Sequence, residues 1–235
     1  MKMLFYMGIG LLLVTANAAA YAQRPVMVFS RADFSTADSL GLILDYGNNK
    51  TLPPGFELQT LIALSYFPEL KDTHIEFRVK PAYSLLQTRP VAHGIFSRRR
   101  RHYTITISDS SYWKLQPIRL DPMNFNAQVG VLGHELSHVA DFSRRSLGSL
   151  IASGIGHLSS RYIDQFEYST DSIAIAHGLG YQLLAWSTFV RSMLHTDNYD
   201  GADNIDKPMM HERYMNPFTI KARIAESPIY GALRQ

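Results

Sequence analysis

Residues 126–142 have the sequence Asn-Ala-Gln-Val-Gly-Val-Leu-Gly-His-Glu-Leu-Ser-His-Val-Ala-Asp-Phe. Their apolar side chains recur at three- and four-residue spacing, which is the pattern of a helix with one face in a protein core. These side chains belong to Val129, Leu132, Leu136, Val139 and Ala140. Asp121 followed by Pro122 is a helix-start signal, and Asn124 and Asn126 are alternative N-cap residues. The stretch therefore predicts a core helix on which the rest of the fold is organised.

Two histidines on this helix have the spacing of metal ligands. His134 and His138 are four residues apart, so on a helix they share a face and both imidazoles can reach one ion. Imidazole nitrogen suits zinc, and two histidines with one carboxylate and an open position for water form a catalytic zinc site. Glu135 lies beside the ligand face. The alternative is a chance match, in which the histidines are ordinary hydrogen-bonded side chains of a half-buried helix.

A catalytic zinc ion needs one more protein ligand, and Glu167 is the best candidate. A second acid, Asp171, follows four residues later on the same face of a helix predicted over residues 161–177. One carboxylate can bind the ion while the other accepts the far ring N–H of a ligand histidine and fixes its tautomer. The alternative is a solvated acidic helix edge. The segment is otherwise apolar, however, and unpaired acids would be costly to bury there.

The two motifs, HExxH at residues 134–138 and ExxxD at residues 167–171, resemble those of the gluzincin zinc metallopeptidases. With a helix break at Gly178, the chain is similar to the minigluzincins and to the catalytic domain of the CAAX-prenyl-protease-like peptidases. The resemblance implies an α+β, zincin-like fold, in which a small twisted sheet packs on helices that include an active-site helix and a third-ligand helix. It also implies an edge strand that lines the cleft and pairs with an extended substrate. We expect that edge at residues 103–108.

The resemblance further implies a mechanism. One zinc ion bound by His134, His138 and Glu167 would activate a water molecule, and Glu135 would act as the general base. Asp171 would orient a ligand histidine.

The group that stabilises the oxyanion is left open by the sequence. Relatives often carry a His-Pro pair followed by Arg-Ile, and the corresponding residues here are Asn216-Pro217 and Arg223-Ile224. Asparagine in place of histidine weakens that correspondence. His211, Arg223 and Tyr214 are therefore all candidates.

The predicted function is that of a secreted zinc-dependent metalloendopeptidase, whose partner is a peptide or protein substrate. Two alternatives stay open: a secreted zinc-containing binding or assembly protein without proteolytic activity, and a zinc hydrolase of a non-peptide amide. An intact Glu135 argues against the binding protein, because zinc binding does not require that residue.

Composition and the N-terminus predict export. Residues 1–22 contain one charged residue, Lys2, then an apolar run and small-x-small cleavage signals, so we expect a signal peptide, with a membrane anchor as the alternative. The run is short for a bilayer, so no stable membrane span is expected after its removal. The 235-residue chain has no cysteine, which excludes disulfides and is compatible with a secreted or periplasmic protein. A net charge of +3 gives no reason to expect a nucleic-acid partner.

We expect a metallopeptidase domain over residues 56–235, preceded at 23–55 by an N-terminal extension or a pro-segment that covers the active site. Residues 74–80 and 103–108 alternate apolar and polar side chains and predict two strands in an antiparallel pair. Helical periodicity predicts further helices over 56–67 and 181–194. Weaker patterns predict a short strand at 26–29, a strand or helical turn at 39–46, a solvated turn at the arginine run 98–101, and a flexible connection or short helix at 143–160.

Overall fold

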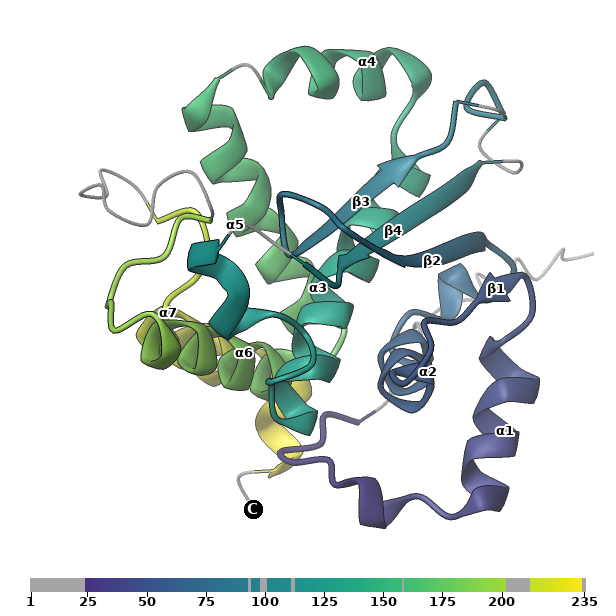
Figure 1. Ribbon diagram of the computed structural model, residues 1–235, viewed down its shortest axis with the longest axis vertical. Helices are drawn as coiled ribbons and strands as arrows, with labels where there is room; N and C mark the ends of the chain where they lie inside the picture. The colour runs from purple at the N-terminus through teal and green to yellow at the C-terminus, as the bar shows by residue number, and fades with distance from the viewer. Residues whose placement is uncertain are drawn as a thin grey trace, which may run out of the picture.

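The computed structural model describes residues 24–92, 94–97, 101–110, 113–157, 159–201 and 212–233. Helices dominate these residues, and a small mixed sheet packs against them (Figure 1), which confirms the α+β prediction. The helices are α1 (Thr36–Tyr46), α2 (Glu57–Ser65), α3 (Phe125–Arg144), α4 (Leu147–Gly156), α5 (Ser160–Ala176), α6 (Gly180–Met193) and α7 (Pro217–Glu226). The strands are β1 (Lys50–Thr51), β2 (His74–Lys80), β3 (Leu86–Pro90) and β4 (His102–Ser108). Within these ranges no helix is both long and apolar enough to cross a membrane.

Helix α3 is the centre of the fold (Figure 1). Most of its 20 residues are buried, and it packs against α2, α5, α6 and β3. Asn124 is its N-cap, because the side-chain oxygen accepts the N–H of Ala127 at 2.9 Å. Gly130 lets α3 approach α6 closely, since a Cβ atom at this position would lie 2.1 Å from the carbonyl oxygen of Gln182.

The sheet has the strand order β1-β2-β4-β3. The predicted antiparallel pairing of residues 74–80 with 103–108 is wrong, because β2 and β4 are parallel, with His74 opposite His102. After β2 the chain reverses direction to form β3 and reverses again to form β4. β4 lies between β2 and β3, so it runs parallel to β2 and antiparallel to β3. The edge strand next to α3 is therefore β3, and the expected edge at residues 103–108 lies inside the sheet.

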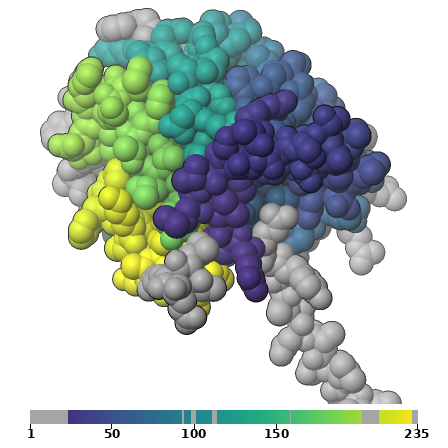
Figure 2. Space-filling view, turned by 90° about the horizontal axis from the view of Figure 1, so that it is seen from below, coloured from purple at the N-terminus to yellow at the C-terminus, as the bar shows by residue number. Residues whose placement is uncertain are grey.

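The N-terminal part packs beside the starts of α3 and α6. The Val26 carbonyl accepts a hydrogen bond from Gln182 Nε2, and the Phe29 N–H donates to Asn126 Oδ1, both at 2.9 Å. Residues 26–29 therefore bind to side chains and form no strand, contrary to the prediction, and residues 39–46 are helical. Figure 2 shows this purple segment lying between the yellow C-terminal part and the blue residues that follow it. None of its described residues lines the cavity at the metal ligands.

The helices that follow α3 agree with the predicted periodicity. α5 and α6 are separated at Gly178, whose positive φ of 99° favours glycine. Residues 147–156 form the short helix α4, which settles the alternative left open for residues 143–160. α5 packs against α3, and this contact forms the candidate site.

Candidate metal centre

Helices α3 and α5 bring the three predicted zinc ligands together. His134 and His138 project from α3, and Glu167 faces them from α5. Glu167 Oε2 lies 3.1 Å from His134 Nε2 and 3.3 Å from His138 Nε2. The side chains of the two histidines are 3% and 8% exposed, and that of Glu167 is 14% exposed. The cluster is therefore largely shielded from bulk water.

Asp171 fixes the tautomer of His134. Its Oδ1 lies 2.8 Å from His134 Nδ1, and its Oδ2 accepts the backbone N–H of Met215 at 2.8 Å. Because Oδ2 already accepts a hydrogen bond from a backbone N–H, a carboxylate at this position offers its other oxygen as an acceptor too. In the neutral ring the proton therefore lies on Nδ1, and Nε2, which faces Glu167, is the nitrogen that can bind a cation. This is the role that the sequence predicts for Asp171.

Thr170 fixes the tautomer of His138 in the same way, and the sequence reasoning missed it. The Thr170 hydroxyl donates to the Phe166 carbonyl at 2.9 Å, so its oxygen can accept the Nδ1–H of His138 at 3.2 Å. Thr170 is almost fully buried. The only sequence signal was its position inside the ExxxD motif, directly before Asp171.

Three electron-pair donors therefore converge on one point, and this arrangement fits a metal ion. Two imidazole nitrogens and one carboxylate oxygen lie within 4.8 Å of one another. Tetrahedral zinc with bonds of 2.0–2.1 Å separates its ligand atoms by about 3.3 Å. The two separations from Glu167 Oε2, 3.1 and 3.3 Å, are of that size. The cluster could therefore hold a metal ion.

The electrostatics of the cluster also favour a positive charge at its centre. Burial opposes protonation of His134, but the hydrogen bonds to Asp171 and Glu167 outweigh it and raise the pKa of His134 well above its usual value. Burial likewise opposes ionisation of Glu167, but the charge on His138 and the hydrogen bonds from both histidines lower the pKa of Glu167 far below its usual value. A cation is what satisfies all three groups at once.

Glu135 lies beside the cluster, at a small cavity of about 70 Å³ that His134 also lines. Its side chain is buried, and Oε2 accepts a hydrogen bond of 2.6 Å from the Thr88 hydroxyl on β3. Apolar side chains line much of the rest of the cavity: Leu85, Leu86, Leu115, Val131 and Trp186. A carboxylate and a metal-ligand histidine thus share one small, mostly apolar cavity.

Two tyrosines, Tyr199 and Tyr214, close another side of this cavity. Their rings stack with centroids 5.4 Å apart, and the ring of Tyr214 lies 5.7 Å from that of His134. Burial raises the pKa of both phenols, so both stay protonated and can donate a hydrogen bond at neutral pH. Of the two oxyanion candidates that the structure describes, Tyr214 and Arg223, it places Tyr214 at the cavity.

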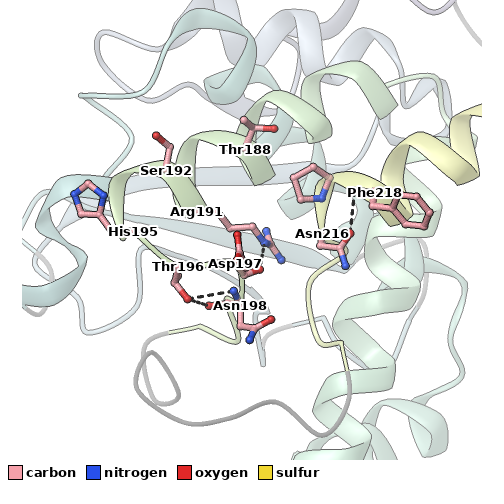
Figure 3. Close-up of a pocket in the computed structure, with 10 residues that line it drawn as sticks. Thr188, Arg191, Ser192, His195, Thr196, Asp197, Asn198, Asn216 and Phe218 are labelled. Atoms are coloured by element: carbon pink, nitrogen blue, oxygen red, sulfur yellow. Dashed lines mark hydrogen bonds between the residues drawn. The ribbon is translucent and has the colours of Figure 1, made fainter.

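Arg191 holds the backbone that carries these tyrosines. Its guanidinium donates to the carbonyl oxygens of Asp197 and Tyr214, each at 3.0 Å. In Figure 3 it projects from α6 toward the segment that follows, between Asp197 and Asn216. The pocket drawn there is separate from the cavity at Glu135, because the two share no lining residue.

Arg223, the other oxyanion candidate that the structure describes, is not at the cavity. Arg223 lies on α7 with its side chain half exposed, and it contacts the Tyr168 hydroxyl at 3.3 Å and Glu226 at 3.4 Å. His211 lies outside the described residues. Of the candidates that the structure describes, the cavity therefore favours Tyr214.

Comparison with known proteins adds no relative. The chain matches no protein-family model, no curated protein and no solved structure. The functional interpretation therefore depends on the residues and contacts described above.

Proposed function

We propose that the protein is a zinc-dependent metallopeptidase that acts on exported or extracellular peptides. One observation carries the proposal: two histidines with fixed tautomers and one glutamate present three lone pairs to a single point, and Glu135 shares a cavity with one of them. A purely structural metal site does not require a further buried carboxylate in a cavity beside its ligands. A hydrolytic site needs one, as the base for water.

The residues divide the catalytic work between them. His134, His138 and Glu167 would hold the ion, whose chemistry is to lower the pKa of a bound water and to polarise a carbonyl. Glu135 would take the proton of that water and return it to the leaving amine. Tyr214 would donate a hydrogen bond to the developing oxyanion.

The substrate class follows from the surroundings of the cavity. β3 is an edge strand of the sheet and lies next to α3, so an extended peptide could pair with the edge of β3 that does not face β4. The apolar lining favours a small apolar side chain in the cavity. Trp186 also lines the cavity, and its indole N–H is buried without a hydrogen-bond partner among the described residues.

A library of quenched fluorescent peptides tests this proposal. Wild-type protein, the variant Glu135→Gln and the control Glu57→Gln would be loaded with zinc and compared. Glu57 is exposed on α2 and lies outside the site, so it controls for the substitution itself. We expect cleavage by the wild type and the control only, at least 100-fold above that of Glu135→Gln. Equal activity of all three proteins would contradict the role of Glu135.

The variant Tyr214→Phe tests the oxyanion donor in the same assay. Removing one donor of this kind typically costs about 100- to 1000-fold in kcat. An unchanged kcat would exclude Tyr214 from that role.

A further inference from the structure

Thr88 lies in the middle of β3, a strand that the sequence does not predict. It pairs with Ile105 of β4, and its side chain reaches α3 at Glu135. We infer that Thr88 is a positioning residue, which fixes the carboxylate of Glu135 and connects it to the strand where substrate binds. This inference rests on the proposed peptidase function.

The first support is the contact itself. The Thr88 hydroxyl has one proton, and the distance of 2.6 Å to Glu135 Oε2 is much shorter than the 3.2 Å to the Glu135 carbonyl. Among the described residues, no other hydrogen bond reaches this carboxylate. The contact therefore engages Oε2, and Oε1 would be the oxygen that accepts the proton of a water molecule. A general base must be held at a defined position and angle to its proton, and this single bond supplies that orientation.

The second support is the direction of the backbone groups of β3. The N–H of Val91 donates to the His102 carbonyl, and the N–H of Ser108 donates to the Leu85 carbonyl. In an antiparallel pair the hydrogen-bonded positions alternate, so the backbone groups of the odd-numbered residues of β3 hydrogen-bond to β4. The N–H and C=O groups of Leu86 and Thr88 therefore point to the free edge. At the end of the strand, Pro90 has no N–H to offer.

Both observations concern Thr88. A peptide that adds to the free edge of β3 would bind the backbone of Thr88, whose side chain holds Glu135. The strand that positions the scissile bond is thereby the strand that positions the base. A displacement of Glu135 by about 1 Å could cost two orders of magnitude in rate, because the reacting groups must be closely aligned.

Kinetics of three variants test this role in the full mature chain. Thr88→Val keeps the shape but removes the hydroxyl, Thr88→Ser keeps the hydroxyl, and Thr106→Val is a matched control. Thr106 is half-buried on β4, and no hydrogen bond joins its side chain to Glu135. For Thr88→Val we expect kcat to fall roughly 10- to 100-fold, with KM within about twofold of the wild type and zinc content unchanged. Thr88→Ser should recover most of the loss, and Thr106→Val should behave as the wild type.

A double-mutant cycle in the metal-free protein gives a second readout, independent of activity. Urea unfolding would be compared for the wild type, Thr88→Val, Glu135→Ala and the double variant. We expect the shift caused by Thr88→Val to disappear when Glu135 is alanine. An equal shift in both backgrounds would overturn the contact, and a rise in KM at constant kcat would overturn the positioning role. A wild type that cleaves no peptide would overturn the peptidase proposal and this role together, while the cycle would still report on the contact.

Discussion

Replacing Asp171 with asparagine should weaken zinc binding through a conflict of hydrogen bonds. Asp171 accepts two hydrogen bonds, from His134 Nδ1 and from the N–H of Met215, both at 2.8 Å. Asparagine offers only one acceptor oxygen, and its NH₂ group must face one of these two donors. If the NH₂ faces His134, the ring proton moves to Nε2 and blocks the metal. If it faces Met215, two N–H groups are opposed in a site that is only 1% exposed.

Both arrangements have a cost that can be estimated. Loss of the partner that orients a metal-binding histidine typically reduces metal affinity 10- to 100-fold. This corresponds to about 1.4–2.7 kcal/mol. In the second arrangement, the unsatisfied buried Met215 N–H would instead cost about 1–3 kcal/mol of folding free energy.

Competition with a chelating dye measures the zinc affinity, and urea unfolding of the metal-free protein measures the stability. Asp45→Asn is the control, because the Asp45 side chain is 66% exposed on α1. We expect the control to match the wild type in both measurements. A variant Asp171→Asn that matches the wild type within twofold in zinc affinity and within about 0.5 kcal/mol in stability would refute the assignment of Asp171 to the orientation of His134.

Three further predictions test the site and the helix packing that supports it. Thr170→Val removes the acceptor for the Nδ1–H of His138 and should lower zinc affinity about tenfold in the dye assay, with no effect if His138 is not a ligand. Gly130→Ala places a methyl group 2.1 Å from the Gln182 carbonyl oxygen, so α3 and α6 must separate; we expect a loss of about 2–3 kcal/mol in urea unfolding, and a change below 0.5 kcal/mol would contradict the close approach. Zinc at 100 times its dissociation constant should stabilise the folded protein by about 2.7 kcal/mol and raise Tm by roughly 5–10 °C, an increase that EDTA reverses and that a chain without a folded metal site would not show.

The sequence predicts the helices of the site well because their patterns are local. α3 and α5 have clear helical periodicity, and their bounds agree with residues 126–142 and 161–177 to within one or two residues. The start of α3 is capped by Asn124, one of the alternative caps, and not at Asp121-Pro122. Since residues four apart on a helix share a face, the ligand pair His134/His138 and the acidic pair Glu167/Asp171 could be predicted from spacing alone. Their meeting across the two helices is what the structure adds.

The strands were harder to predict because pairing depends on distant residues. The sequence of β3, Leu-Gln-Thr-Arg-Pro, has no clear apolar alternation and ends in proline, as a partly exposed edge strand can. Once β3 was missed, β2 and β4 were expected to form an antiparallel pair, and the wrong strand was assigned to the edge. The role of Thr88 also depends on that edge, so no pattern around it in the sequence could have indicated it.

The positions of the aromatic residues at the cavity were not predictable for a similar reason. Tyr199 and Tyr214 are 15 positions apart along the chain, and they stack only because Arg191 and neighbouring groups hold their backbone. The general count of tyrosine and phenylalanine indicates a large aromatic core but does not distinguish cavity residues from the rest.

The central claim is that His134, His138 and Glu167 hold one catalytic zinc ion. X-ray absorption at the zinc edge, on Glu135→Gln loaded with one equivalent of zinc, tests it most directly, because this variant keeps all three ligands. We predict one tightly bound ion per chain, with two imidazole nitrogens and oxygen ligands at about 2.0–2.1 Å. The imidazole signal should fall by half in Glu135→Gln/His138→Ala. Zinc that binds without imidazole, or a spectrum that the His138 substitution leaves unchanged, would contradict the account.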